Sequence, residues 1–214
     1  MENVSAVDAE STGLATRFGD GTHNVLLLSP SLDANAEDAC TDLLTVEPPA
    51  REDVLYVTLV DSPDERMDAW RARADGARPA KMGFVDVGGA TRSSAAASVL
   101  GGDPLGDVLV RPVSSPGNLT DLGIKVSEFL SEWSDDGNRT VVCVDSLTTL
   151  LQYADLQRAF RFLHVLTGRV RALDAFAHYH LDPDAHDDRT LNTLLTLFDG
   201  VAEWDGSGWV VRNR

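Results

Sequence analysis

The sequence predicts one α/β domain of three layers, in which a mainly parallel β-sheet carries helices on both faces and ends in a C-terminal antiparallel hairpin. Short apolar, β-branched runs alternate with amphipathic segments almost throughout the chain, as they do in successive βαβ units. Residues 200–212 break this alternation, because they hold two short strand-like runs around the turn Asp205-Gly206-Ser207-Gly208. At 214 residues the chain is long enough for one well-buried core.

The predicted strands are residues 25–28, 54–60, 82–87, 140–144 and 175–180, and the predicted helices are residues 36–45, 63–74, 118–133, 155–173 and 189–198. Pro63 is suited to a first helical turn, and Asp155 to a helix N-cap. Residues 88–107 are rich in Gly, Ala and Ser without periodicity, so we expect a flexible loop there. Residues 1–22 are polar and aperiodic, which predicts a mobile N-terminal segment followed by the domain at 23–214.

Hydropathy and cysteine content favour a cytoplasmic protein with no membrane contact. No run approaches the roughly 18 consecutive apolar residues of a membrane span, and the first twenty residues lack the pattern of a secretory signal. Cys40 and Cys143 are the only cysteines. Cys143 lies within an apolar run, which predicts a small buried thiol rather than part of a disulfide framework.

The charge of the chain is strongly acidic, with a formal net value of −16. It has 25 Asp against 9 Glu and only 2 Lys against 16 Arg, a pattern that resembles proteins of salt-accumulating archaea. At about 1 M salt the screening length falls to about 3 Å, so this charge serves solubility and says little about distant partners. It does make nucleic acid an unlikely partner, because phosphate-backbone binding needs a basic stripe.

Three segments carry a family resemblance. They are residues 24–28 with the loop that follows, residues 54–59 followed by Asp61-Ser62-Pro63-Asp64, and the strand Thr140-Val141-Val142-Cys143-Val144-Asp145 followed by Ser146. Together they resemble the RecA/KaiC-like ATPases of the P-loop superfamily, and within them a haloarchaeal KaiC-like group of unassigned function. The most specific is the third, which is similar to a Walker B strand and the serine after it. The resemblance covers residues 23–212 and implies a RecA-like fold with a nucleotide crevice at the carboxyl ends of the strands.

The loop after the first strand departs from this family. The family pattern Gly-x-x-x-x-Gly-Lys-Ser/Thr cradles phosphates with backbone amides, while its lysine and hydroxyl contact the phosphates and magnesium. In place of the two glycines, the lysine and the hydroxyl residue, this chain has Ser29, Ala34, Asn35 and Ala36. Asp33 adds a negative charge that would repel phosphate. The family's paired acidic residues fall at Val60 and Asp61, so only one carboxylate remains.

The sequence therefore predicts a catalytically inactive RecA/KaiC-like domain with no catalytic residue and no expected cofactor. Its function would be regulatory or scaffolding, through contacts with itself or with an active KaiC-like relative. An alternative is a sensor that binds ATP-Mg or another small ligand. The remnants of the nucleotide site are Ser29, Pro30, Asn35, Asp61, Asp145 and Ser146.

A second alternative is a metal-dependent enzyme. Strand alternation places His178 and His180 on one face of their strand, with Asp182 and His186 in the adjoining loop. These residue types bind zinc, manganese or iron. The competing interpretation is that the imidazoles are hydrogen-bonded and that the aspartates form turns and a helix N-terminus.

Arginines on one face of a predicted helix are candidates for a protein interface. Arg158, Arg161 and Arg169 lie within about 80° of one another around the helix over 155–173. In so acidic a chain, this cluster could meet an acidic partner or a second subunit. The alternative is a solvated face paired with local aspartates.

Overall fold

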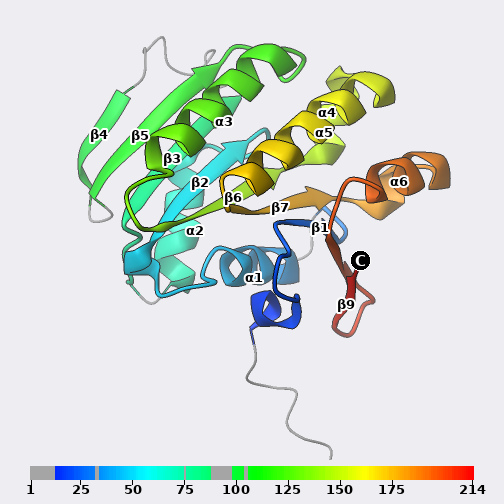
Figure 1. Cartoon of the computed structure of the whole chain (residues 1–214), viewed down its shortest axis with the longest axis horizontal. Helices are drawn as coiled ribbons and strands as arrows, with labels where there is room; N and C mark the ends of the chain where they lie inside the picture. Colours follow the sequence, from blue (N-terminus) through cyan, green and yellow to red (C-terminus); the bar gives the residue numbers. More distant parts are fainter. Residues whose placement is uncertain (1–12, 32–33, 75, 88–97, 104–105) are drawn as a thin grey trace, which may run out of the picture.

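The computed structural model describes residues 13–31, 34–74, 76–87, 98–103 and 106–214 (Figure 1). The strands are β1 Asn24–Leu28, β2 Glu52–Thr58, β3 Lys81–Val87, β4 Ser98–Asp103, β5 Gly106–Val113, β6 Arg139–Asp145, β7 Phe176–Leu181, β8 Gly200–Trp204 and β9 Trp209–Asn213. The α-helices are α1 Ala34–Leu43, α2 Pro63–Arg73, α3 Leu119–Trp133, α4 Leu147–Tyr153, α5 Leu156–Ala172 and α6 Asp188–Leu195. Three short 3-10 helices are η1 Leu14–Arg17, η2 Pro49–Arg51 and η4 Pro183–Ala185.

The strands form one sheet in the order β4-β5-β3-β2-β6-β7-β1-β8-β9. All neighbouring pairs from β5 to β8 are parallel, and the outer strands β4 and β9 pair antiparallel with β5 and β8. This confirms the predicted α/β class and the C-terminal hairpin.

The strands β4 and β5 correct the prediction of a flexible loop at 88–107. Their pairing supplies the reason, because β5 lies beside the buried strand β3 with Val108 opposite Met82, and Val108 and Val113 are buried. Main-chain pairing with β3 therefore outweighs the glycine-rich composition. Residues 88–97 of the expected loop lie outside the described residues.

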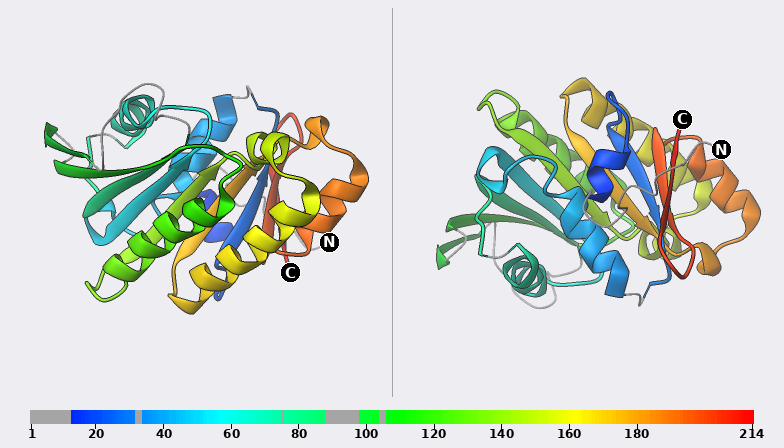
Figure 2. Two further views of the ribbon diagram at one scale, coloured as in Figure 1. Left: turned by 90° about the horizontal axis from the view of Figure 1, so that it is seen from above. Right: turned by 90° about the horizontal axis from the view of Figure 1, so that it is seen from below.

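Alternation along each strand divides the core into two layers (Figures 1 and 2). In β2, for example, Leu55 and Val57 join the core layer under α3, α4 and α5, whereas Val54 and Tyr56 join the layer under α1 and α2. The same alternation holds in β1, β6 and β7. A sheet covered on both faces needs apolar residues at successive positions, which explains the near-continuous apolar runs in the sequence.

Helix starts follow the capping chemistry of the sequence. Ser62 and Glu65 form a capping box at the start of α2, Asn118 caps α3, and Asp155 caps α5. The helix α4 was not predicted. Its N-cap is Ser146, whose side chain accepts a hydrogen bond from the amide of Thr149.

The N-terminal part of the described chain packs onto the domain rather than staying apart from it. The 3-10 helix η1 lies against α1, where Leu14 is buried, and the Phe18 ring covers Gly200. Residues 1–12 of the expected N-terminal segment lie outside the described residues. Among the described helices, none combines the length and the hydropathy needed to cross a bilayer.

Candidate functional site

A cavity of about 350 Å³ opens at the carboxyl ends of β1, β2, β6 and β7, and we call it the crevice. Parallel sheets bind ligands at this edge, and the volume lies within the range of small-molecule sites. Five of the six predicted nucleotide-site remnants line it, namely Ser29, Pro30, Asp61, Asp145 and Ser146. Asn35 lies in the first turn of α1 and is not among the lining residues.

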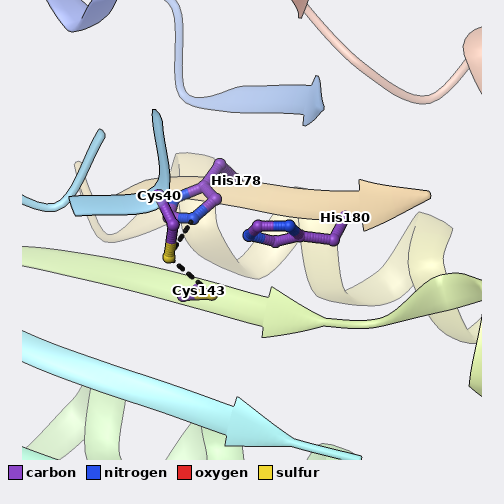
Figure 3. A group of neighbouring side chains, drawn as sticks. All are labelled: Cys40, Cys143, His178 and His180. Carbon is purple, nitrogen blue, oxygen red and sulfur yellow. Dashed lines mark hydrogen bonds between the residues drawn. The ribbon is translucent and has the colours of Figure 1, made fainter. Parts of the chain in front are cut away.

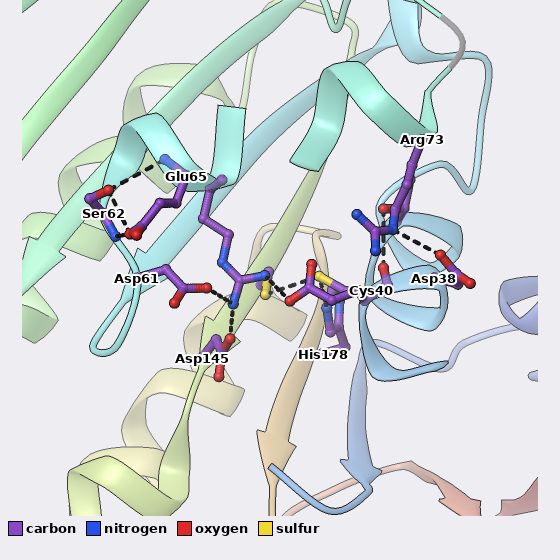
Figure 4. A network of polar contacts seen from close by, with 12 residues as sticks. Asp38, Cys40, Asp61, Ser62, Glu65, Arg73, Asp145 and His178 are labelled. Atoms are coloured by element: carbon purple, nitrogen blue, oxygen red, sulfur yellow. Dashed lines mark hydrogen bonds and ion pairs between the residues drawn. The ribbon is translucent and has the colours of Figure 1, made fainter. Parts of the chain in front are cut away.

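The centre of the crevice is occupied by Arg66, a residue of α2. Its side chain is 3% exposed, because Arg66 shares the buried face of α2 with Met67 and Trp70. The guanidinium Nη1 donates to Glu37 Oε1 at 3.0 Å. Nη2 lies 3.0 Å from Asp61 Oδ2 and also donates to Asp145, so the carboxylates at the ends of β2 and β6 converge on one cation (Figure 4).

The guanidinium of Arg66 remains charged in this setting. Burial alone would lower its pKa, but the thiols of Cys143 and Cys40 and the carboxylates of Glu37 and Asp61 outweigh burial and raise it. Arg66, Glu37, Asp61 and Asp145 form one network of ion pairs and hydrogen bonds in a partly dry site. The crevice thus contains its own positive charge, supplied by the protein.

The loop after β1 is tied to the end of β7. The Ser29 amide donates to the carbonyl of Leu181 at 3.2 Å. Both the amide and the hydroxyl of Ser31 donate to Asp182 Oδ2, at 2.9 and 2.7 Å. In a phosphate-binding loop such amides face the phosphate, whereas the Ser31 amide faces a carboxylate of the same chain.

Asp182 is held as a carboxylate by these donors. Burial opposes its charge, but the hydrogen bonds from Ser31 and from the Asp184 amide lower its pKa overall. Its own amide donates to Thr148 Oγ1 at 2.8 Å, which joins the end of β7 to α4. Asp182 therefore fixes the β1 loop and α4 to one strand end.

A second group of side chains adjoins the crevice through His180 (Figure 3). Cys143 of β6 is opposite His178 of β7 in the parallel register, and His180 lies two residues further along the same face. Cys40 of α1 covers this face, with its Sγ 3.5 Å from Cys143 Sγ and 3.3 Å from His178 Nε2. We call these four buried residues the Cys-His cluster.

The Cys-His cluster differs from the set of metal-binding residues expected from the sequence. His178 and His180 come together as predicted, with ring centroids 5.2 Å apart. Among the described residues, however, the side chains that join them are Cys40 and Cys143, and not Asp182 and His186. Asp182 is instead engaged by Ser31, and burial lowers the pKa of His186. A strand and its following loop point their side chains in different directions, so residues that are close in the sequence are not gathered at one place here.

The predicted interface arginines lie on a large groove between α3 and α5, of about 860 Å³. Arg158, Arg161 and Arg169 line it beside the exposed side chains of Ile124 and Val165. Within the described residues these arginines have no carboxylate within 4 Å; Arg158 donates to the Gly117 carbonyl and Arg169 to the Ser131 hydroxyl. The alternative of a face paired with local aspartates is therefore not found in the described structure.

Sequence reasoning missed Arg66, Glu37 and the two cysteines as members of the site. A signal for Arg66 was present, because it precedes Met67 and is four residues before Trp70, which places it on the apolar face of a helix. No comparable signal exists for Cys40 and Cys143. They are 103 positions apart, and only the packing of α1 on β6 brings them together.

The order of the strands and the carboxylates at their ends define a RecA-like α/β domain. Within that class, the chain belongs to DUF7504, a family of unknown function, whose profile matches residues 22–204. A search of curated proteins gives no match.

Solved structures of two proteins from Pyrococcus horikoshii OT3 share the fold. One is a KaiC-like protein, PH0186, which is 11% identical, with a TM-score of 0.55 over 92% of this chain and 80% of the other. The other is the subject of a structural study under the project identifier PH0250; it is 14% identical, with a TM-score of 0.55 over 90% of this chain and 86% of the other. At these identities the likeness extends to the fold alone.

Proposed function

We propose that this chain is a KaiC-like domain with a degenerate phosphate-binding loop, which does not hydrolyse ATP and acts as a regulatory or scaffolding protein. The observation that carries the proposal is the position of Arg66. Its guanidinium binds Asp61 and Asp145, the two carboxylates that in the resembled ATPases would orient water and hold magnesium. Both carboxylates thereby share one cation of the protein itself, without a metal or a triphosphate.

The β1 loop supports the same proposal. It lacks the glycines and the lysine of the family pattern, and the Ser31 amide is bonded to Asp182. A phosphate entering here would meet that carboxylate and no lysine. Since phosphoryl transfer depends on positioning and charge stabilisation, the loop offers little for either. The acidic, lysine-poor composition supports an origin in a salt-accumulating archaeon.

Calorimetric titration of the purified protein with ATP-Mg in molar KCl tests this proposal. We expect no binding heat at micromolar to millimolar nucleotide and no release of phosphate. Micromolar affinity for ATP-Mg that is lost in Asp145→Asn would overturn the proposal and support a nucleotide sensor. Asp184→Asn, close to the crevice but not lining it, is the matched control.

The α3–α5 groove supports a role in protein contacts. It combines exposed apolar side chains on both helices with arginines that have no ion-pair partner among the described residues. A partner with acidic side chains around an apolar strip is complementary to it. The proposed partner is a second copy of this chain, whose net charge of −16 supplies acidic side chains, or a KaiC-like relative.

Two measurements test the groove. Light scattering in solution detects self-association, and a pull-down with this chain as the bait detects a KaiC-like relative from the same cell. We expect the double variant Arg158→Glu, Arg161→Glu to weaken the association at least tenfold. The control Arg189→Glu changes an exposed arginine of α6, outside the groove, and should leave it unchanged. Equal association of the wild type, the double variant and Arg189→Glu would contradict the proposal that the groove is the contact surface.

A further inference from the structure

The Cys-His cluster combines four metal-ligand side chains from three separate elements. Cys40 comes from α1, Cys143 from β6, and His178 and His180 from β7. Each side chain offers one ligand atom, and these atoms all lie within 4.8 Å of one another. Their exposed fractions range from 0 to 8%, so the group is enclosed by protein.

The distances are close to those of a tetrahedral metal site. Zinc bonds of about 2.3 Å to sulfur and 2.0–2.1 Å to nitrogen place neighbouring ligand atoms about 3.3–3.8 Å apart. The separation of Cys40 Sγ from Cys143 Sγ is 3.5 Å, and that from His178 Nε2 is 3.3 Å. The other ligand atoms lie within 4.8 Å of one another, so binding an ion requires the side chains to draw closer together.

The hydrogen-bonding state of the histidines points to a ligand as well. His178 Nδ1 and His180 Nε2 are buried and have no hydrogen-bond partner among the described residues. A buried polar atom without a partner is costly, and buried imidazoles are usually paired or bound to a metal. His180 Nε2 therefore offers unused ligand capacity, whereas His178 contacts Cys40 through Nε2 and leaves Nδ1 as its unpartnered nitrogen.

We propose that Cys40, Cys143, His178 and His180 bind one zinc ion as a closed, structural site. Two thiolates balance the charge of a divalent ion, so the complex is neutral and suited to an enclosed position. Sulfur and imidazole ligands favour zinc over magnesium or calcium. With four protein ligands the ion has no open position for water or substrate, which distinguishes the site from the centre of a metal-dependent enzyme.

The place of the cluster in the fold indicates what the ion does. Cys40 lies on the helix that follows the β1 loop, and His180 also lines the crevice. A zinc ion would join α1 to the two central strands β6 and β7 and support the floor of the crevice. This inference does not rest on the absence of ATPase activity, because metal content and nucleotide binding are measured separately.

Elemental analysis and cobalt titration test the proposal on the full chain, purified in molar KCl under reducing conditions. We expect close to one zinc per chain, or the uptake of one equivalent after reconstitution. Cobalt bound to the metal-free protein should give the intense visible spectrum of tetrahedral thiolate coordination. Cys40→Ser and His180→Ala should each lower zinc affinity at least a hundredfold.

The matched control is His186→Ala, which removes a nearby histidine outside the cluster and should retain full zinc binding. Because buried substitutions can impair folding, thermal unfolding is followed in parallel. Zinc should raise the midpoint of the wild type and of His186→Ala, and a chelator should lower it, while the midpoint of His180→Ala should not respond.

Failure of the reduced wild type to take up zinc or cobalt overturns the proposal, as does zinc binding that is lost in His186→Ala but kept in Cys40→Ser. The proposal is also overturned if the protein is isolated without metal, with a Cys40–Cys143 disulfide, and binds no zinc after reduction.

Discussion

Arg66 of α2 donates a hydrogen bond to the carboxylate of Asp145, the residue that ends β6. The pair lies at the level where the central strands end, and both residues line the crevice. A side chain of the protein thus supplies a cation directly beside Asp145. The stability of the domain and the chemistry of its crevice consequently depend on the same residue.

Substitution of Arg66 should be strongly destabilising. Arg66→Met leaves Asp145 and Asp61 without their cation, and breaking a buried ion pair from one side costs about 3–5 kcal/mol. Urea unfolding at neutral pH measures the loss. Arg73→Met, which breaks the exposed pair with Asp38, should cost less than about 1 kcal/mol. Similar losses in the two variants would contradict the central role of Arg66.

The tie between Ser31 and Asp182 should determine how firmly the β1 loop is held. Asp182→Ala removes the acceptor of both Ser31 hydrogen bonds, so amide hydrogen exchange at Ser31 should accelerate at least tenfold. Stability should fall by about 1–3 kcal/mol. Asp184→Ala is the control, because only the backbone amide of Asp184 contributes to this arrangement. Unchanged exchange in Asp182→Ala would show that the loop is held by other contacts.

Close packing of α3 on β3 makes Gly83 sensitive to a single methyl group. A Cβ at Gly83 would lie 2.6 Å from Phe129 Cε1 and 2.8 Å from Trp133 Cη2. Gly83→Ala should therefore lower the free energy of unfolding by about 1–3 kcal/mol, measured by urea unfolding. Gly168→Ala on α5 meets nothing within 4 Å and should stabilise the protein by about 0.5–1 kcal/mol through helix propensity. If Gly83→Ala is also neutral or stabilising, α3 must shift freely on the sheet.

Glu52 should make stability depend on pH between about 4.5 and 7. Burial raises the pKa of its carboxyl to about 7, although the Glu47 amide opposes the shift. Because the folded value exceeds the unfolded one, this contribution is fully present below pH 4.5 and is lost as the pH rises through 7. Glu52→Gln should remove that dependence, on the order of 3 kcal/mol. Unfolding curves of wild type and variant across this range measure the difference, and the exposed Glu128→Gln should behave as the wild type does.

The sequence was sufficient for the central part of the fold. Alternation within β1, β2, β6 and β7 fills both core layers with apolar residues, so these strands stand out as continuous apolar runs. Pro63 and Asp155 located the starts of their helices, because a first-turn or cap residue acts through its immediate neighbours.

Elements that depend on distant partners were not predictable in this way. The strand β5 is stabilised by pairing with β3, and the glycine-rich residues before it show no strand pattern. In the site, the family resemblance named Asp61 and Asp145 as members of one crevice, but their cation comes from a helix whose charged residues suggest exposure. The Cys-His cluster depends on the parallel register of Cys143 with His178, which no local pattern specifies.

A guanidinium that belongs to the polypeptide cannot dissociate, whereas a magnesium nucleotide exchanges with the pool in the cell. The cation beside Asp145 is therefore present as soon as the chain has folded. If the domain binds no nucleotide, as proposed above, it does not alternate between loaded and empty forms and presents one form to its surroundings. Its influence on other molecules would follow from how many copies are present, which makes its abundance the variable to measure.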